Sequence, residues 1–167
     1  YELFVGGKFD YYAKLKKLYG EEFPCIYDSL KLELRQLDER ELYLKMIETE
    51  KDQEALLAYV KEDLRYIERF ASLLWDTFET EVHHLYEQYI KQELMKVSHR
   101  SGYRRICAIF RRYRPFTTNQ AYQTLIHQLI AMYPRRRALI EELQCLLHEL
   151  EEESSNQHVE QLSIDIA

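Results

Sequence analysis

Residues 78–97 read FETEVHHLYEQYIKQELMKV, and apolar side chains recur in this stretch every three or four positions. The stripe consists of Val82, Leu85, Tyr86, Tyr89, Ile90 and Leu94. That spacing is typical of an α-helix that buries one face, because a half-buried strand would alternate every second residue. The stretch therefore predicts a long amphipathic helix.

Similar stripes lie on both sides of this stretch. They predict helices over residues 9–19, 24–37, 41–47, 55–60, 64–75, 103–114 and 121–133, with a short helix before Gly6-Gly7 and a last one from Pro134 to about Glu152. An all-β fold needs a turn every 8–12 residues or so, and the chain has only 4 Gly and 3 Pro. We therefore expect an all-α protein of about nine helices.

Residues that start or stop helices punctuate these stripes. Gly20 and Pro115 are expected to end helices, and Pro24 suits a first helical turn. Asp38 with Glu41 has the spacing of a capping box. Side-chain caps are also predicted at Asp52, Ser98, Ser101 and Thr118.

Short connections favour helices paired in antiparallel hairpins, which could stack as an α-solenoid. Gly7-Lys8-Phe9-Asp10 resembles the turn inside a tetratricopeptide repeat. The alternative is a compact, irregular helical bundle. We expect a helical-repeat domain over residues 1–152 and a flexible, polar tail over residues 153–167.

The composition favours a cytoplasmic protein that does not cross a membrane. No apolar run approaches the ~18 residues of a membrane span, and no secretory segment is present. Cys25, Cys107 and Cys145 are far apart, so we expect reduced, mostly buried thiols. Because the chain begins with Tyr1, we expect it to be part of a longer protein.

Charge is divided into blocks along the chain. Residues 1–95 carry a balance of −8, residues 96–137 hold 10 Lys and Arg with no acid, and residues 138–167 hold 8 acids with no Lys or Arg. Such blocks usually meet an opposite block in the same molecule or in another.

Arginines on the polar face of the helix over residues 103–114 are the main candidate site. They are Arg100, Arg104, Arg105, Arg111, Arg112 and Arg114. Because guanidinium groups bind phosphate bidentately, this stripe could bind nucleic acid or an acidic partner. It could equally be a solvated face neutralised by the neighbouring acidic helix.

Arg135, Arg136 and Arg137 occupy a helix start, where the helix dipole disfavours cations. We expect carboxylates of an adjacent helix to offset this cost, the alternative being a bound anion or an acidic partner.

Metal and catalytic motifs are not found. Glu79, His83 and Glu87 share one helical face, but a di-iron bundle needs a second Glu-x-x-His segment, so we expect solvent-exposed histidines at His83 and His84. No phosphate-binding loop or nucleophile motif occurs. We therefore expect no enzymatic activity, catalytic residue, metal or cofactor. Most of the 14 tyrosines are expected to pack in the core, with an aromatic groove for a partner helix as the alternative.

Three stretches resemble the C-terminal helical region of bacterial SWIM zinc-finger proteins. They are Leu85-Tyr86-Glu87-Gln88-Tyr89-Ile90, Tyr103-Arg104-Arg105-Ile106-Cys107, and residues 129–143, which contain Tyr133-Pro134-Arg135-Arg136-Arg137-Ala138-Leu139. Arg137 stands where the family usually has Pro, and the family's Cys-x-Cys and Cys-x-His ligands are absent from this chain. The resemblance covers residues 78–147 well, and it implies a cytosolic bacterial protein whose zinc finger lies upstream.

The sequence thus predicts a non-enzymatic helical-repeat interaction module with a protein partner. Nucleic-acid binding through the Arg-rich segment of residues 96–137 is the alternative.

Overall fold

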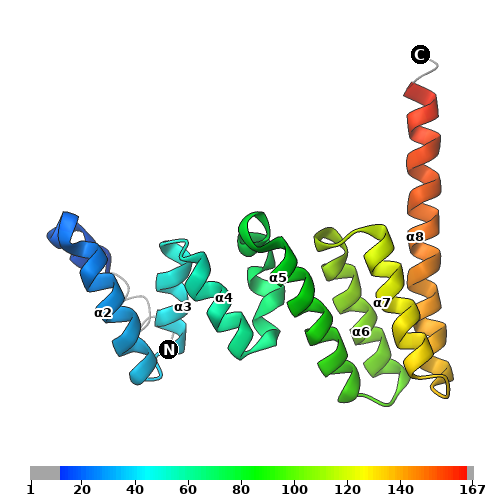
Figure 1. Cartoon of the computed structure of the whole chain (residues 1–167), viewed down its shortest axis with the longest axis horizontal. Coiled ribbons are helices and arrows are strands. Elements are labelled where there is room, and N and C mark those ends of the chain that lie inside the picture. The colour runs from blue at the N-terminus through cyan, green and yellow to red at the C-terminus, as the bar shows by residue number, and fades with distance from the viewer. Residues whose placement is uncertain (1–11, 165–167) are drawn as a thin grey trace. The chain divides into compact units, whose positions relative to one another are not determined.

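The computed structural model describes residues 12–164, and these contain helices and short connections with no strand (Figure 1). Residues 12–19 are helical, and the α-helices that follow are α2 (Phe23–Gln36), α3 (Arg40–Thr49), α4 (Gln53–Glu62), α5 (Ile67–Met95), α6 (Arg100–Tyr113), α7 (Asn119–Met132) and α8 (Arg137–Ile164). Three 3-10 turns, η1 (Gly20–Glu22), η2 (Leu64–Tyr66) and η3 (Arg114–Phe116), lie between them. The prediction of an all-α fold is confirmed.

The expected count of about nine helices is not what the described residues show. Residues 64–75 and 78–97, predicted as two helices, are joined in α5. The expected helix before Gly6-Gly7 and the tetratricopeptide-like turn at Gly7-Lys8-Phe9-Asp10 lie outside the described residues.

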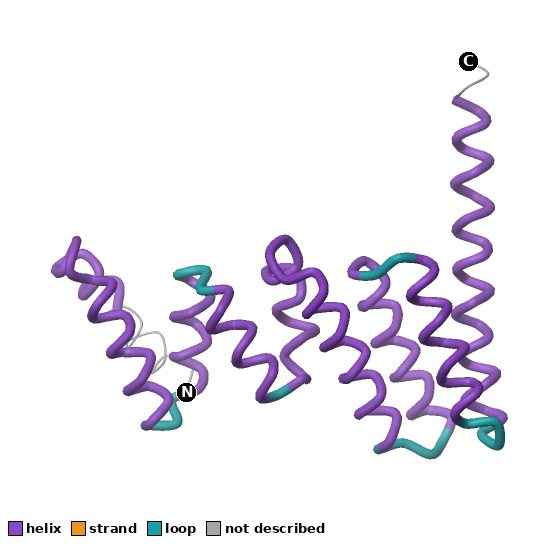
Figure 2. Tube along the Cα trace, viewed as in Figure 1, coloured by secondary structure: helices purple, strands orange, loops and turns teal. Residues whose placement is uncertain are grey.

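The chain divides into two compact units, residues 1–59 and residues 60–167. In the first unit α2 packs against α3. In the second unit α6 packs against both α5 and α8, and α7 packs against α8 (Figure 2). The last helix was expected to end near Glu152, but α8 continues to Ile164.

The helix α5 contains a kink where the sequence predicted a break. Phe78 has a non-helical backbone (φ −127°, ψ 44°), and helical residues continue on both sides of it. Sharp kinks need an identifiable cause, and this segment contains neither Pro nor Gly. The two apolar stripes predicted from the sequence lie on either side of Phe78 within α5, and no loop lies between them.

Several helix boundaries follow local signals. Gly20 has a positive φ of 44° and ends the first described helix. Pro24 lies in the first turn of α2. The Asp52 carboxylate accepts a hydrogen bond from the Ala55 amide at 3.0 Å, and the Thr118 hydroxyl accepts one from the Ala121 amide at 3.2 Å. These four predictions are confirmed.

The predicted capping box at Asp38 and Glu41 is wrong. Asp38 has a positive φ of 55° and belongs to the end of α2, where the Glu39 amide donates to the carbonyl of Leu34. This is a Schellman ending, in which the αL position is usually Gly. The Asp38 carboxylate instead accepts a hydrogen bond from Arg40 Nε at 2.7 Å, and Glu39 precedes α3 without a side-chain cap.

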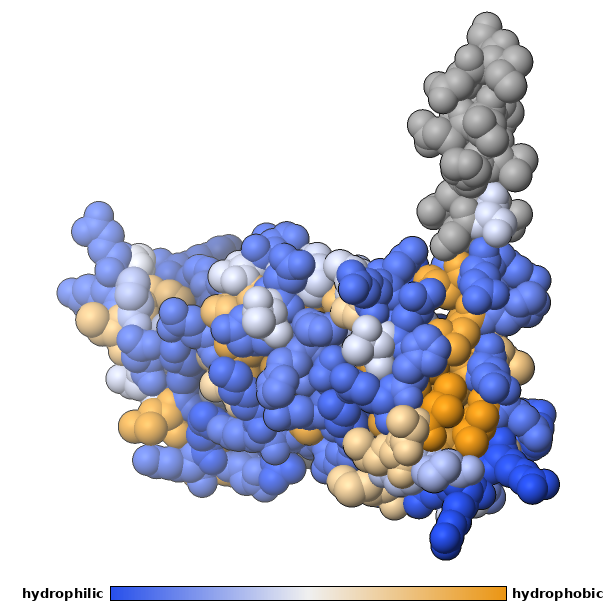
Figure 3. All heavy atoms as spheres, turned by 45° about the vertical axis from the view of Figure 1, so that its right-hand side comes forward, coloured by the Kyte–Doolittle hydropathy of each residue, from blue (hydrophilic) through white to orange (hydrophobic). Residues whose placement is uncertain are grey.

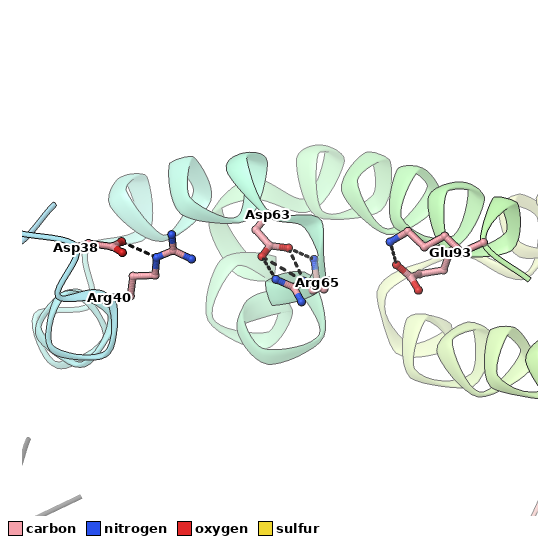
Figure 4. Close-up of polar contacts among 6 residues, drawn as sticks. Asp38, Arg40, Asp63, Arg65 and Glu93 are labelled. Atoms are coloured by element: carbon pink, nitrogen blue, oxygen red, sulfur yellow. Dashed lines mark hydrogen bonds and ion pairs between the residues drawn. The ribbon is translucent and has the colours of Figure 1, made fainter. Parts of the chain in front are cut away.

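A similar short-range pair follows α4, where Asp63 accepts hydrogen bonds from the amide and the guanidinium of Arg65 (Figure 4). The predicted caps at Ser98 and Ser101 are also wrong. The helix α6 begins at Arg100 after an extended His99, so Ser98 lies before the cap position and Ser101 lies inside the first turn.

Aromatic rings fill much of the core, as predicted. Seven tyrosines are buried, namely Tyr12, Tyr43, Tyr86, Tyr89, Tyr103, Tyr113 and Tyr122. The expectation of mostly buried cysteines is wrong, because Cys25 and Cys145 are exposed. Only Cys107 is buried, and burial raises the pKa of its thiol to about 12.

Candidate interaction surfaces

The predicted arginine stripe lies on α6 and faces carboxylates of neighbouring helices. One face of α6 is buried through Tyr103, Ile106 and Phe110, which places the arginines on the opposite side. Arg100 pairs with Glu141 and Glu142, Arg104 with Glu142, Arg111 with Glu149, Arg112 with Glu68 and Arg114 with Glu153. Four of these five arginines therefore pair with α8, and Arg112 pairs with α5.

The Arg111–Glu149 contact has the best geometry in this set. Nη2 and Nε of Arg111 donate to the two carboxylate oxygens at 2.6 and 3.0 Å. The hydrogen bonds raise the pKa of Arg111 and lower the pKa of Glu149. Exposed pairs of this kind contribute about 0–1 kcal/mol each, so their main consequence is that the positive charge of α6 is neutralised within the second unit.

Three of the candidate arginines have no such partner. Arg105, Arg135 and Arg137 are exposed, and their side chains make no ion pair or hydrogen bond within the described part of the chain. Arg136 differs from them, because its Nη1 donates to the Val97 carbonyl at 3.3 Å and its guanidinium lies 4.5 Å from the centre of the Tyr133 ring. Carboxylates of an adjacent helix were expected to pair with the arginines at the start of α8. The observed partners of Arg136 are instead a backbone carbonyl and an aromatic ring.

A small cavity of about 180 Å³ lies among α6, α7 and α8. Its charged lining consists of Arg111, Arg114, Glu149 and Glu153, two cations and two anions. The Arg114 guanidinium lies 5.5 Å from the centre of the Tyr122 ring, and its buried Nε makes no hydrogen bond. Because opposite charges already meet in this cavity, it offers no net charge to an ion.

A longer groove runs between α5 and the η3–α7 corner. Two cavities, of about 230 and 350 Å³, share His83, Thr118 and Ala121 and together form what we call the α5–α7 groove. Its lining comprises Trp75, Glu79, Thr80, His83 and Glu87 from α5, and Phe116, Thr117, Thr118, Gln120, Ala121 and Thr124 from the corner. Among the described residues, this lining contains two carboxylates and no Lys or Arg, while Lys91 outside the lining pairs with Glu87 at 3.4 Å.

Ring packing fixes the aromatic end of this groove. The Phe116 ring stacks on Tyr86 at 5.7 Å and meets the edge of Trp75 at 5.5 Å. Tyr86 is fully buried, so it supports Phe116 from the core, and Trp75 lies at the rim of the groove. Glu79 follows the kink at Phe78 and is exposed. The lining of the groove thus includes a carboxylate and two aromatic rings.

His83 lies in the middle of the groove and is not the solvent-exposed histidine expected from the sequence. Its ring stacks on the buried Tyr113 at 5.6 Å, and Nδ1 is hydrogen-bonded to the Tyr113 hydroxyl. Burial raises the pKa of Tyr113 to about 12, so this hydroxyl keeps its proton. The other ring nitrogen of His83, Nε2, lies 3.6 Å from the carboxylate of Glu87.

An apolar stripe is exposed along α7 and α8. Figure 3 shows apolar atoms gathered over these two helices. Leu139, Leu143, Leu146 and Leu150 are the buried face of α8. Next to this face, Ile140 and Leu147 are half-exposed, as is Ile130 of α7. A continuous apolar surface of this kind often marks a site of association.

In the first unit, two tyrosine–carboxylate–lysine clusters surround the turn before α4. Glu50 accepts hydrogen bonds from Tyr12 at 2.8 Å and from Lys16 at 2.7 Å. Asp52 accepts from Tyr27 at 2.8 Å and from Lys31 at 2.9 Å. These clusters tie the turn to the helices before it.

The described residues contain no group of three or more His, Cys, Asp or Glu side chains placed to hold a metal ion. None of the described helices is long and apolar enough to span a membrane.

Comparison with known proteins adds no relative. No protein-family model, curated protein or solved structure matches this chain significantly. The resemblance to SWIM zinc-finger proteins therefore remains a prediction.

Sequence reasoning missed both the α5–α7 groove and the apolar stripe. Glu79, His83 and Glu87 were visible as one helical face, but nothing in the sequence indicated that Phe116 and Thr118 would lie opposite them. The stripe had a weak signal in Ile140 and Leu147, which are seven residues apart and extend the apolar pattern beyond what one neighbouring helix can cover.

Proposed function

We propose that this chain is a non-enzymatic interaction module that binds a basic segment of a protein partner in the α5–α7 groove. The observation that supports this most directly is the lining of the groove, which combines Glu79 and Glu87 with aromatic rings and includes no cation. A Lys or Arg side chain of a partner would meet the carboxylate of Glu79 in a lining that also includes Trp75 and Phe116.

The energies involved suit a modest, reversible interaction. An exposed charge pair is worth about 0–1 kcal/mol, and a cation over an aromatic ring adds about 0.5–2 kcal/mol. A net charge of −6 also favours the approach of a basic partner. Glu87 already pairs with Lys91 at 3.4 Å, so Glu79 is the carboxylate most open to a basic residue of a partner.

The single tryptophan gives this proposal a local readout. Trp75 is the only tryptophan in the chain and lies at the rim of the groove, so its fluorescence reports on occupancy there. The probe is an acetylated, amidated Gly-Arg-Gly-Arg-Gly peptide, and the same peptide with citrulline for arginine keeps the shape without the charge. We expect a saturable fluorescence change with the first peptide and none with the second.

Matched variants locate the binding. Glu79→Gln should weaken peptide binding about two- to fivefold, since it removes one exposed carboxylate contact. Glu81→Gln is the control, because Glu81 is also exposed on α5 but does not line the groove. Equal binding of the citrulline peptide, or equal effects of the two substitutions, would refute the proposal.

Nucleic-acid binding is the second candidate function. It is favoured by Arg105, Arg135 and Arg137, which are exposed and lack side-chain partners among the described residues. Fluorescence polarisation with single-stranded DNA, duplex DNA and RNA at low ionic strength tests it. The absence of binding to all three would eliminate it.

The α-solenoid arrangement of the helices and the relation to SWIM zinc-finger proteins are also proposals. Successive packing of α2 on α3, α5 on α6 and α8 on α6 and α7 is compatible with stacked α-solenoid repeats in a cytoplasmic protein. A Cys-x-Cys and Cys-x-His quartet encoded ahead of Tyr1 would place the chain with bacterial SWIM zinc-finger proteins. A preceding sequence without that quartet would exclude the affiliation.

A further inference from the structure

One face of α8 combines apolar and charged residues in a regular order. Arg137, Ile140, Gln144, Leu147 and Glu151 follow one another at spacings of three and four, so they form a single stripe along the helix. Each is exposed or half-exposed, and the stripe borders the face that α8 buries in its own unit.

The middle of this stripe is apolar. Ile140 and Leu147 are half-exposed there, and Ile130 of α7 is half-exposed as well. The apolar atoms over α7 and α8 in Figure 3 form one connected area. Burying such side chains in an interface contributes about 25 cal/mol per Å² of apolar surface, which offsets part of the entropy lost on association.

The ends of the stripe carry opposite charges. Arg137 has no ion pair or hydrogen bond through its side chain within residues 12–164. The carboxylate of Glu151 lies 3.9 Å from Nδ1 of His148. The two residues are separated by fourteen positions, or about 21 Å along a helix that rises ~1.5 Å per residue. Each of them lies seven residues from Gln144.

We propose that the apolar stripe of α7 and α8 is the contact surface for a second copy of this chain, with the two α8 helices antiparallel across a two-fold axis at Gln144. In that arrangement Arg137 of one copy faces Glu151 of the other, and the contact occurs twice because a two-fold interface is self-complementary. A parallel arrangement would place Arg137 against Arg137 and Glu151 against Glu151. This inference concerns a surface separate from the α5–α7 groove and does not depend on peptide binding there.

The oligomeric state of the whole chain tests the apolar part of this surface. Sedimentation velocity over a range of concentrations should show a monomer–dimer equilibrium for the unmodified chain. Leu147→Glu should shift that equilibrium to monomer while circular dichroism stays unchanged, since Leu147 is already half-exposed. Leu32→Glu is the matched control, because Leu32 is 63% exposed on α2 and should leave the dimer intact.

Charge reversal tests the antiparallel arrangement. Arg137→Glu and Glu151→Arg should each weaken the dimer roughly tenfold, since each replaces two attractive contacts by two repulsive ones. The double variant, and also an equimolar mixture of the two single variants, should restore it. A protein that stays monomeric at every concentration, or a dimer indifferent to Leu147→Glu, would overturn the proposal. Failure of the double variant to restore the dimer would overturn the antiparallel register.

Discussion

At the scale of single residues, Gly102 shows how one position can fix a connection between helices. It lies buried in the first turns of α6, under Val97 of the preceding loop. A Cβ atom built on Gly102 would lie 2.7 Å from Cβ and 2.9 Å from Cγ1 of Val97. Carbon atoms do not approach so closely, so the chain can make this contact only because residue 102 lacks a side chain.

Gly102→Ala should therefore destabilise the protein. In an exposed helix the same change stabilises by roughly 1 kcal/mol, because Gly is a poor helix former. Here the clash with Val97 should reverse the sign and cost about 1–3 kcal/mol. Urea unfolding followed by circular dichroism measures the difference, and Ser101→Ala at the neighbouring exposed position is the control. A variant more stable than the parent would mean that Val97 moves aside freely.

At the scale of elements, the turn between α3 and α4 depends on two carboxylates. Burial alone would raise the pKa of Glu50, but hydrogen bonds from Lys16 and Tyr12 lower it below its ordinary value. Burial would likewise raise the pKa of Asp52, and hydrogen bonds from Lys31, the Ala55 amide and Tyr27 lower it. A carboxyl whose pKa is lower in the folded state stabilises the fold when ionised.

The stability of the first unit should consequently fall in acid. The contribution of Glu50 and Asp52 is complete above their unfolded pKa values, near 4.5 and 3.8, and is lost as the pH falls through their lower folded values. Asp52→Asn keeps an oxygen for the Ala55 amide but removes the charge that pairs with Lys31, so it should reduce stability at neutral pH by about 1 kcal/mol and flatten this acid dependence.

Urea unfolding between neutral pH and about pH 3 measures both effects of Asp52→Asn. Glu54→Gln, at an exposed position of the same helix turn, should change little. An acid profile unaltered by Asp52→Asn would show that the turn does not depend on this carboxylate.

The elements themselves could largely be predicted from the sequence, because periodicity and helix caps are local properties. Pro24, Asp52 and Thr118 act within a few residues, and each marks a helix start as expected. Asp38 failed as a cap because it completes the preceding helix in a left-handed conformation. Sequence spacing alone cannot decide between these two roles.

At the scale of the whole molecule, the charge blocks were visible in the sequence but their pairing was not. The acidic residues Glu142 and Glu149 lie 38 positions from the arginines they meet, Arg104 and Arg111. Two interpretations were open from the sequence, a free cationic surface and neutralisation by the acidic helix. The packing of α6 on α8 favours neutralisation, because most of the arginines on α6 already have carboxylate partners.

This pairing predicts a shallow salt dependence for any binding to duplex DNA. Each phosphate contact contributes about −0.9 to the slope of log affinity against log salt concentration. Arg105, Arg135 and Arg137, which have no side-chain partner among the described residues, would give a slope of about −3, whereas nine free arginines would give about −8. Fluorescence polarisation over a range of ionic strengths measures the slope.

Two substitutions test which arginines contact phosphate. Arg135→Gln should reduce the magnitude of the slope by about one. Arg111→Gln should leave the slope unchanged, because in the unmodified chain Arg111 is bound to Glu149 and makes no phosphate contact. A steep slope that both substitutions reduce would mean that the ion pairs between α6 and α8 open when DNA binds.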